Sequence, residues 1–202
     1  MTIEATSEAT HESLLALAAQ TRELMSAVAA TGVADEELAA VTDELRALTA
    51  RLKSVRAEAE VGRPRWLLGN AVVGAANPFA PPIDIQPAPG GGVRAEHVFP
   101  SLHEGPPGLV HGGVSAMVLD HLLGAAVGAA GRGGVTASLT VSYRAPLPYG
   151  VPVVATAEFT RSEGRKSWAD GRIALPDGTV AVEATGLFIT PKWFPEMPGD
   201  HS

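Results

Sequence analysis

The chain has 202 residues, 46% of them hydrophobic, no cysteine, and a formal net charge of −7. This composition supplies a buried core and excludes an intrinsically disordered chain, and the acidic balance argues against nucleic acid as the main partner, because phosphate backbones bind basic surfaces. The lack of cysteine excludes disulfides, thiolate metal sites and a cysteine nucleophile, and it fits the reducing cytoplasm, where we expect the protein to be located.

Two helices are predicted at the start of the chain, over residues 12–30 and from Asp35 to about residue 59. The first eight residues are acidic and lack the apolar segment of a signal peptide. Gly32 is a predicted left-handed stop, and Asp35 is the predicted N-cap of the second helix. The apolar positions of that helix follow a heptad pattern: Leu38, Val41, Leu45, Leu48, Leu52 and Val55. The pattern fits either a hairpin that folds back on itself or on the domain, or an oligomerisation element.

Residues 61–92 form a proline-rich segment that ends in three consecutive glycines. Proline at this density prevents a regular helix. The segment nevertheless carries too many apolar side chains for a solvated linker: Trp66, Leu67, Leu68, Val72, Val73, Phe79 and Ile83. We therefore expect an ordered segment, which is either a lid or pocket wall, or a cover draped across the core.

Beyond residue 92 the pattern predicts one strand, one long helix and then four more strands. The strands are expected at residues 93–99, 135–143, 151–159, 167–175 and 180–189, with a hairpin turn at Pro176-Asp177-Gly178. A sheet of about five antiparallel strands must wrap round the helix to bury it, so the predicted fold class is α+β. The predicted organisation is a helical hairpin (1–60), a connecting segment (61–92), the sheet-and-helix domain (93–190) and a frayed tail (191–202).

The long helix, between residues 110 and 131, is apolar on nearly every face, so we expect the domain to enclose it. His111, Asp120 and His121 interrupt the run, which favours a core helix over a membrane span. Asp120 is the one carboxylate in this helix, and a buried acid is either a hydrogen-bonded structural group or a functional one.

The helix begins at Gly112-Gly113, where bare backbone amides can stabilise a developing oxyanion. Gly113 and Asp120 are seven residues apart, roughly 10 Å along one helix, so one small carbonyl cannot touch both. If the two act together, they come from two antiparallel helices across a two-fold axis, which predicts a homodimer with two equivalent sites.

Other chemistries fit the sequence poorly. A serine hydrolase site is disfavoured, because Ser115 lies inside the helix and lacks the second glycine of a nucleophile elbow. A dinucleotide-binding loop is also disfavoured, because the glycine-rich residues 128–134 follow a helix, whereas such a loop follows a strand. The spacings of the histidines match no zinc pattern, so we expect neither a metal nor a separate cofactor: His97, His103, His111 and His121.

The chain from about residue 106 to residue 190 resembles the hotdog-fold acyl-CoA thioesterases, in particular the PaaI-like branch that includes the thioesterase-superfamily-member enzymes. The resemblance rests on His111-Gly112-Gly113, on Asp120 nine positions after the histidine, and on the stretches at residues 135–148, 163–166 and 183–189. It implies a hotdog fold, hydrolysis of acyl-CoA to free acid and CoA, and a homodimer or a dimer of dimers. CoA is then part of the substrate.

The resemblance also implies roles for single residues. Asp120 is the catalytic carboxylate, which activates water or attacks the thioester directly, and Thr136 orients the water unless it is an ordinary strand residue. Gly112 and Gly113 polarise the carbonyl, and His111 holds their turn. Four residues match positions that contact coenzyme A in this family: Ser142, Arg144, Arg165 and Lys166. The alternative interpretation, a solvated cationic turn without a ligand, stays open mostly for Lys166.

The acyl chain is expected in the apolar space between paired helices, near Met117, Leu122 and Leu123, under Trp66 and Phe79. Two alternative functions remain at this stage. The first is a non-catalytic acyl-CoA sensor, for which the heptad helix would be the partner surface. The second is a hotdog enoyl-CoA hydratase, which typically uses a histidine several residues after the aspartate, whereas His121 follows Asp120 directly.

Overall fold

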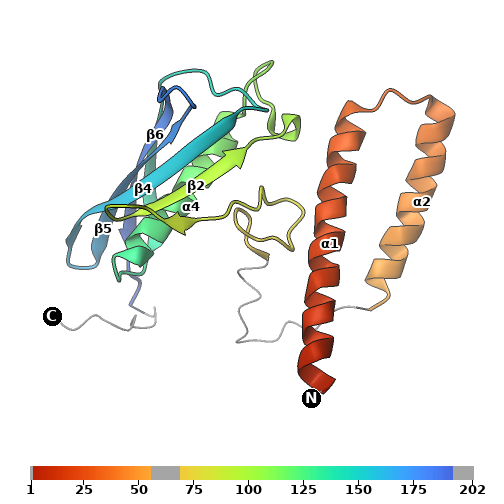
Figure 1. The fold of residues 1–202 in the computed structure, drawn as a ribbon, viewed down its shortest axis with the longest axis horizontal. Helices are drawn as coiled ribbons and strands as arrows, with labels where there is room; N and C mark the ends of the chain where they lie inside the picture. Colours follow the sequence, from red (N-terminus) through yellow and green to blue (C-terminus); the bar gives the residue numbers. More distant parts are fainter. Residues whose placement is uncertain (1, 56–68, 193–202) are drawn as a thin grey trace.

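The computed structural model describes residues 2–55 and 69–192, with side chains from residue 12 onward. A curved antiparallel sheet holds one helix against its inner face, and two N-terminal helices lie beside this domain (Figure 1). The six strands are ordered β1-β2-β4-β5-β6-β3, with bounds Gln86–Pro87, Val93–Val98, Val135–Tyr143, Pro152–Glu163, Lys166–Ala174 and Val180–Ile189 for β1 to β6. The predicted α+β hotdog fold is confirmed, and the two-residue β1 is a strand that the sequence did not predict.

Strands β4, β5 and β6 are neighbours both in sequence and in the sheet, as expected for hairpins. The predicted turn between β5 and β6 is confirmed, because Asp177 Oδ1 accepts a hydrogen bond from the Thr179 N–H at 2.9 Å and Gly178 has φ +85°. Strand β3, in contrast, lies at the sheet edge beside β6. After β3 the chain passes the positions of β6 and β5 and enters the sheet again as β4, next to β2.

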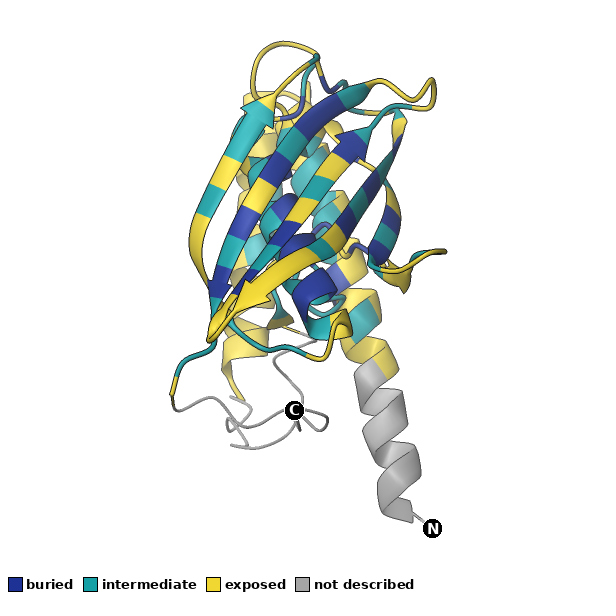
Figure 2. Ribbon diagram, turned by 90° about the vertical axis from the view of Figure 1, so that its left-hand side faces the viewer, coloured by how far each residue is buried: buried dark blue, intermediate teal, exposed yellow. Residues whose placement is uncertain are grey.

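Helix α4 (Gly112–Ala129) packs on the sheet through one buried stripe: Ser115, Val118, Leu119, Leu122, Leu123, Ala126 and Val127. The buried positions alternate along the central strands that cover it (Figure 2). The expectation that the domain encloses this helix on all sides is wrong within one chain, because Met117, Asp120 and His121 on its other side are only half-buried. Among the described residues α4 is also the helix with the length and apolar composition to cross a membrane, and its buried stripe supports the predicted core helix.

Helix α1 (Thr2–Ala30) packs against the domain, and helix α2 (Asp35–Lys53) lies beyond it, farthest from the sheet (Figure 1). The side chain of Ala18 is 2% exposed, and the Arg22 guanidinium donates to the carbonyl oxygens of Ala75 and Asn77 at 3.2 and 3.1 Å. The predicted N-cap is off by one residue: Ala34 is the N-cap of α2, and Asp35 lies in the first turn. The left-handed stop expected at Gly32 is also wrong, since its φ is not positive.

The described part of the connecting segment, residues 69–92, covers the core. Val72, Ala80 and Ile83 are buried there, and the Ile83 N–H donates to the Val72 carbonyl oxygen at 3.2 Å. Phe79 is 61% exposed and Trp66 lies outside the described residues, so their place as a roof over the acyl chain stays a prediction. Most of the tail, predicted to fray, also lies outside them.

Candidate active site

Asp120 and Thr136 meet on the side of α4 that the sheet leaves open. The Thr136 hydroxyl donates a hydrogen bond to Asp120 Oδ1 at 2.8 Å. Thr136 is exposed and Asp120 half-buried, so one chain by itself supplies only part of the burial predicted for Asp120. The reason is that Asp120 lies opposite the buried stripe, where the edge strand β3 reaches it through Thr136 but leaves it half-buried.

A β-bulge in strand β3 decides which way Thr136 faces. Thr136 is paired with Phe188 on β6, but the next paired position joins Ser138 to Leu187, so Ala137 is the extra residue. Thr136 and the inward-facing Phe188 lie on the same face, towards α4. Strict alternation along β3 would instead have placed Thr136 on the outer face together with Thr140 and Ser142.

Three side-chain hydrogen bonds hold the start of α4. His111 Nδ1 accepts from the Gly113 N–H at 3.0 Å, and the hydroxyls of Ser115 and Tyr143 each donate to the Gly112 carbonyl oxygen at 2.9 Å. His111 therefore caps the helix, and the Gly113 amide already has an acceptor. Within the described residues the Gly112 N–H has none, which leaves it free to meet a ligand at the positive end of the helix dipole.

Tyr143 was missed in the sequence, because its contact with the helix start depends on the register of β3. Its ring lies so close to Gly112 that a Cβ atom there would be 2.9 Å from the tyrosine hydroxyl oxygen. A glycine is therefore required at Gly112 while the ring keeps this position.

The residues predicted to contact coenzyme A divide between the two ends of the sheet. Lys166 on β5 pairs with Ile189 on β6, which pairs in turn with Val135 on β3, so the β4–β5 turn lies at the Asp120 end. Arg165 in that turn donates to the Thr190 carbonyl oxygen at 3.1 Å.

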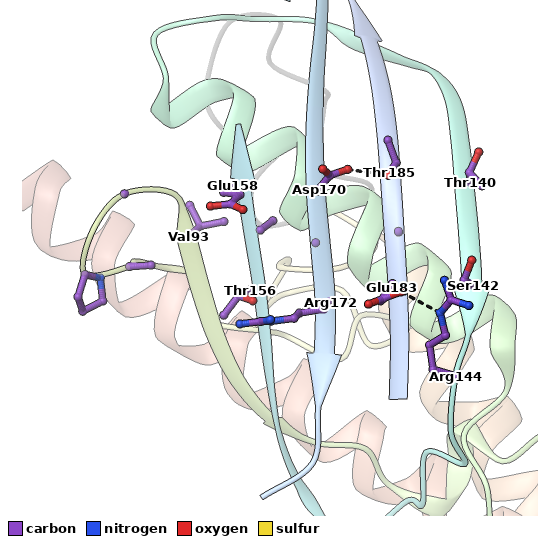
Figure 3. A pocket seen from close by; sticks show the side chains of 16 residues that line it. Val93, Thr140, Ser142, Arg144, Thr156, Glu158, Asp170, Arg172, Glu183 and Thr185 are labelled. Atoms are coloured by element: carbon purple, nitrogen blue, oxygen red, sulfur yellow. Dashed lines mark hydrogen bonds and ion pairs between the residues drawn. The ribbon is translucent and has the colours of Figure 1, made fainter. Parts of the chain in front are cut away.

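Ser142 and Arg144 lie at the other end, near the start of α4. Arg144 forms an ion pair with Glu183 at 2.8 Å on the outer face of the sheet, beside a polar cavity of about 570 Å³ that Ser142 also lines (Figure 3). Arg144 borders a second cavity of about 440 Å³ as well, together with Gly112 and Tyr143. One chain therefore does not bring all the predicted site residues together.

Burial disfavours the charged form of three histidines. It lowers the pKa of His97 to about 4, with a further contribution from nearby His103, and it lowers the pKa of His103. The pKa of His121 is lowered by burial as well, while the neighbouring Asp120 acts in the opposite direction. No group of three or more side chains suited to a metal ion occurs in the described part of the chain.

The expected acyl pocket needs one correction. Leu122 and Leu123 are fully buried between α4 and the sheet, so they cannot line an open groove. Met117 is half-buried on the other side of the helix and stays available for that role.

Comparison with known proteins connects this geometry to a family. Residues 107–182 match the model of the Thioesterase superfamily. A thioesterase superfamily protein of known crystal structure is 33% identical in sequence to this chain and superimposes on it with a TM-score of 0.80. The match covers 87% of this chain and 94% of that protein's chain. The chain belongs to the thioesterase superfamily. Because residues 61–202 make up only about 70% of the chain, the match of this superfamily member to that structure extends into the N-terminal helices.

Curated relatives match a shorter part of this thioesterase superfamily member. Acyl-coenzyme A thioesterase THEM4 of Xenopus laevis is 40% identical over 87 residues, which are 43% of this chain and 39% of the relative. The mouse protein of the same name is 37% identical over 99 residues. The chain thus spans about two-fifths of the length of these relatives. The PaaI protein of E. coli is 18% identical with a TM-score of 0.50 and covers 54% of this chain and 82% of its own, which shows the shared fold alone.

Proposed function

We propose that this protein hydrolyses acyl-CoA thioesters to free acid and CoA, with Asp120 as the catalytic carboxylate. The observation that carries the proposal is the hydrogen bond from Thr136 to Asp120 on the open side of α4. Membership of the thioesterase superfamily and the curated relatives named acyl-coenzyme A thioesterase support the same chemistry.

The proposed step follows from the direction of that hydrogen bond. The Thr136 hydroxyl gives its proton to Asp120 Oδ1, so its lone pairs accept a hydrogen bond from water, while Oδ2 takes the water proton. The water oxygen bonds to the thioester carbon, and a Gly112 N–H stabilises the oxyanion. Collapse breaks the C–S bond, and the CoA thiolate leaves with the proton from Asp120. Direct attack by Asp120 is the other route, and a single turnover in ¹⁸O-water distinguishes the two. Only direct attack, followed by hydrolysis of the mixed anhydride at its aspartyl carbon, puts ¹⁸O into the Asp120 side chain, whereas attack by water puts it into the product acid.

The site requires a second copy of the chain. Gly112 and Asp120 lie about two helical turns apart on α4, and Thr136 and Arg144 lie roughly 25 Å apart along β3. Beyond β6, strand β3 has no other neighbour in the described part of the sheet, and its edge leaves Val135 and Tyr143 exposed. Antiparallel pairing of two such edges about a two-fold axis would bring the partner's Gly112 to Asp120, so we infer a homodimer with two sites.

Coenzyme A would then bind between the two copies. Arg165 and Lys166 lie at the Asp120 end of one chain, and the partner's Arg144 would lie beside the start of its own α4. These guanidinium and ammonium groups suit the phosphates of coenzyme A. The paired helices would enclose the acyl chain next to Met117.

The test is thiol release from a series of acyl-CoA substrates. Asp120→Asn is expected to lower kcat at least about 100-fold, because the amide cannot accept the water proton. Asp170→Asn is the matched control: Asp170 also accepts a hydrogen bond from a threonine, Thr185 at 2.6 Å, but on the outer face of the sheet. Undiminished turnover by Asp120→Asn would refute the mechanism. Tight binding of acyl-CoA by the wild type without hydrolysis would identify a sensor, and consumption of enoyl-CoA without thiol release would identify a hydratase.

A further inference from the structure

Within the described residues the heptad face of α2 is largely uncovered, because Val41 and Leu45 are half-buried and its other four apolar positions are exposed. Leu38, Leu48, Leu52 and Val55 are 40%, 47%, 62% and 81% exposed, and none of the residues of α2 is buried. Five of the six heptad positions lie within this one helix, and Val55 follows two residues after it. We call these six residues the α2 seam. Apolar side chains at this spacing are typical of a helix that packs along another helix.

Helix α2 lies on the outside of the molecule, and its exposed seam positions are accessible there. Helix α1 lies between α2 and the sheet, so α2 is the outermost element of the molecule (Figure 1). The buried contacts of the helical hairpin with the domain come from α1, through Ala18 and Arg22. Helix α2 therefore contributes nothing to the core that would explain a continuous apolar seam.

We propose that α2 of one copy packs antiparallel against α2 of a second copy through this seam. A two-fold axis that passes between residues 46 and 47 places every seam position of one copy opposite a seam position of the other copy. Leu45 then faces the partner's Leu48, Val41 faces the partner's Leu52, and Leu38 faces the partner's Val55. No seam residue is left without an apolar neighbour, as knobs-into-holes packing requires.

The charges of α2 select the antiparallel orientation. Its first turn carries Asp35, Glu36 and Glu37, and its last turn carries Arg51 and Lys53. In the antiparallel pair Glu37 flanks the seam opposite the partner's Arg51, and the symmetric pair forms at the other end. A parallel pair would place the acidic ends together and the basic ends together, which costs energy. The one unfavourable contact of the antiparallel pair is Glu44 against the partner's Glu44, at its centre.

This interface is separate from the β3 edge, so it adds a second two-fold contact. If both form in an assembly with closed symmetry, it has four chains, and loss of the α2 pair leaves two. If the β3 edges do not pair, the wild type has two chains and loss of the α2 pair leaves one. The mass therefore halves in either case, and this readout does not depend on the proposed thioesterase activity.

Charge reversal tests the pairing and its orientation. In sedimentation experiments, Glu37→Arg and Arg51→Glu are each expected to raise the dissociation constant of this contact about tenfold, because each turns two attractive pairs into two repulsive ones. The double variant Glu37→Arg/Arg51→Glu restores the pairs and is expected to return to the wild-type value. The proposal would be overturned if the mass of the wild-type assembly did not fall on dilution, or if the Leu48→Glu variant had the same mass as the wild type. It would also be overturned if the double variant associated no more tightly than the single variants.

A single cysteine gives an independent test, since the chain has none of its own. Glu44→Cys places a thiol near the axis, about 7.5 Å along the helix from the thiol of the second copy, which is too far for a disulfide but within reach of a short bismaleimide. Crosslinking with that reagent is expected to give a covalent dimer in high yield. Ala47→Cys is the matched control, because Ala47 is exposed on the side of α2 turned away from the seam, and it is expected to stay monomeric on a denaturing gel. Equal yields from the two variants, or no covalent dimer from Glu44→Cys, would overturn the antiparallel pair.

Discussion

The contact between Gly112 and Tyr143 at the start of α4 makes a quantitative prediction. A methyl group added by Gly112→Ala would lie 2.9 Å from the Tyr143 hydroxyl oxygen, 3.0 Å from Cζ and 3.1 Å from Cε1. These distances are too short, so the ring must move, and the hydrogen bond from Tyr143 to the Gly112 carbonyl oxygen is lost. That bond contributes about 1 kcal/mol, and forced repacking costs about 1–3 kcal/mol. Because Tyr143 is 58% exposed, its ring can turn outward, so we expect a total loss of about 1–2 kcal/mol.

A double-mutant cycle isolates this contact. With Tyr143→Ala in place the clash is absent, so Gly112→Ala should be neutral or slightly stabilising, because alanine favours a helix over glycine by up to about 1 kcal/mol. The assay is urea denaturation followed by circular dichroism at one protein concentration, since assembly contributes to stability. Gly128→Ala is the matched control within α4, where an added Cβ meets nothing within 4 Å and should not destabilise. Equal costs of Gly112→Ala in both backgrounds would refute the reasoning.

Three further predictions concern pH, the bulge and the core. The pKa of His97 is about 4 in the folded chain and about 6.5 in the unfolded chain, so its contribution to stability is complete above pH 6.5 and is lost as the pH drops towards 4. The expected loss is about 1–2 kcal/mol after allowing for partial exposure. Denaturation measured at pH 7.5 and at pH 5 should show this fall in the free energy of unfolding, and His97→Gln should reduce it. Deleting Ala137 should turn Thr136 outward and lower turnover at least about tenfold while the circular dichroism spectrum stays native-like; wild-type turnover would contradict the assigned bulge. Leu119→Ala should cost about 2–5 kcal/mol in urea denaturation, because Leu119 is 0% exposed, and a cost below 1 kcal/mol would count against the packing described for α4.

The order of the elements could be predicted from local patterns. Alternating residues marked the strand of residues 135–143 with its observed bounds, and the hairpin turn at Asp177 follows from side-chain chemistry within three residues. The α4 helix is apolar along its whole length, so its existence was predictable, but its two faces look alike in sequence. Nothing local said that one face packs on the sheet while Asp120 stays half-exposed on the other.

The candidate site shows the same division more sharply. The amino-acid sequence alone determined the fold class, the spacing of His111, Asp120 and Thr136, and the resemblance that these residues carry. Only the tertiary structure decided that a bulge at Ala137 turns Thr136 towards Asp120, that His111 already occupies the Gly113 amide, and that Arg144 lies at the far end of β3. The physical reason is that the face and the neighbours of a strand residue depend on its register with a partner strand some fifty residues away, and periodicity within one strand holds no information about that register.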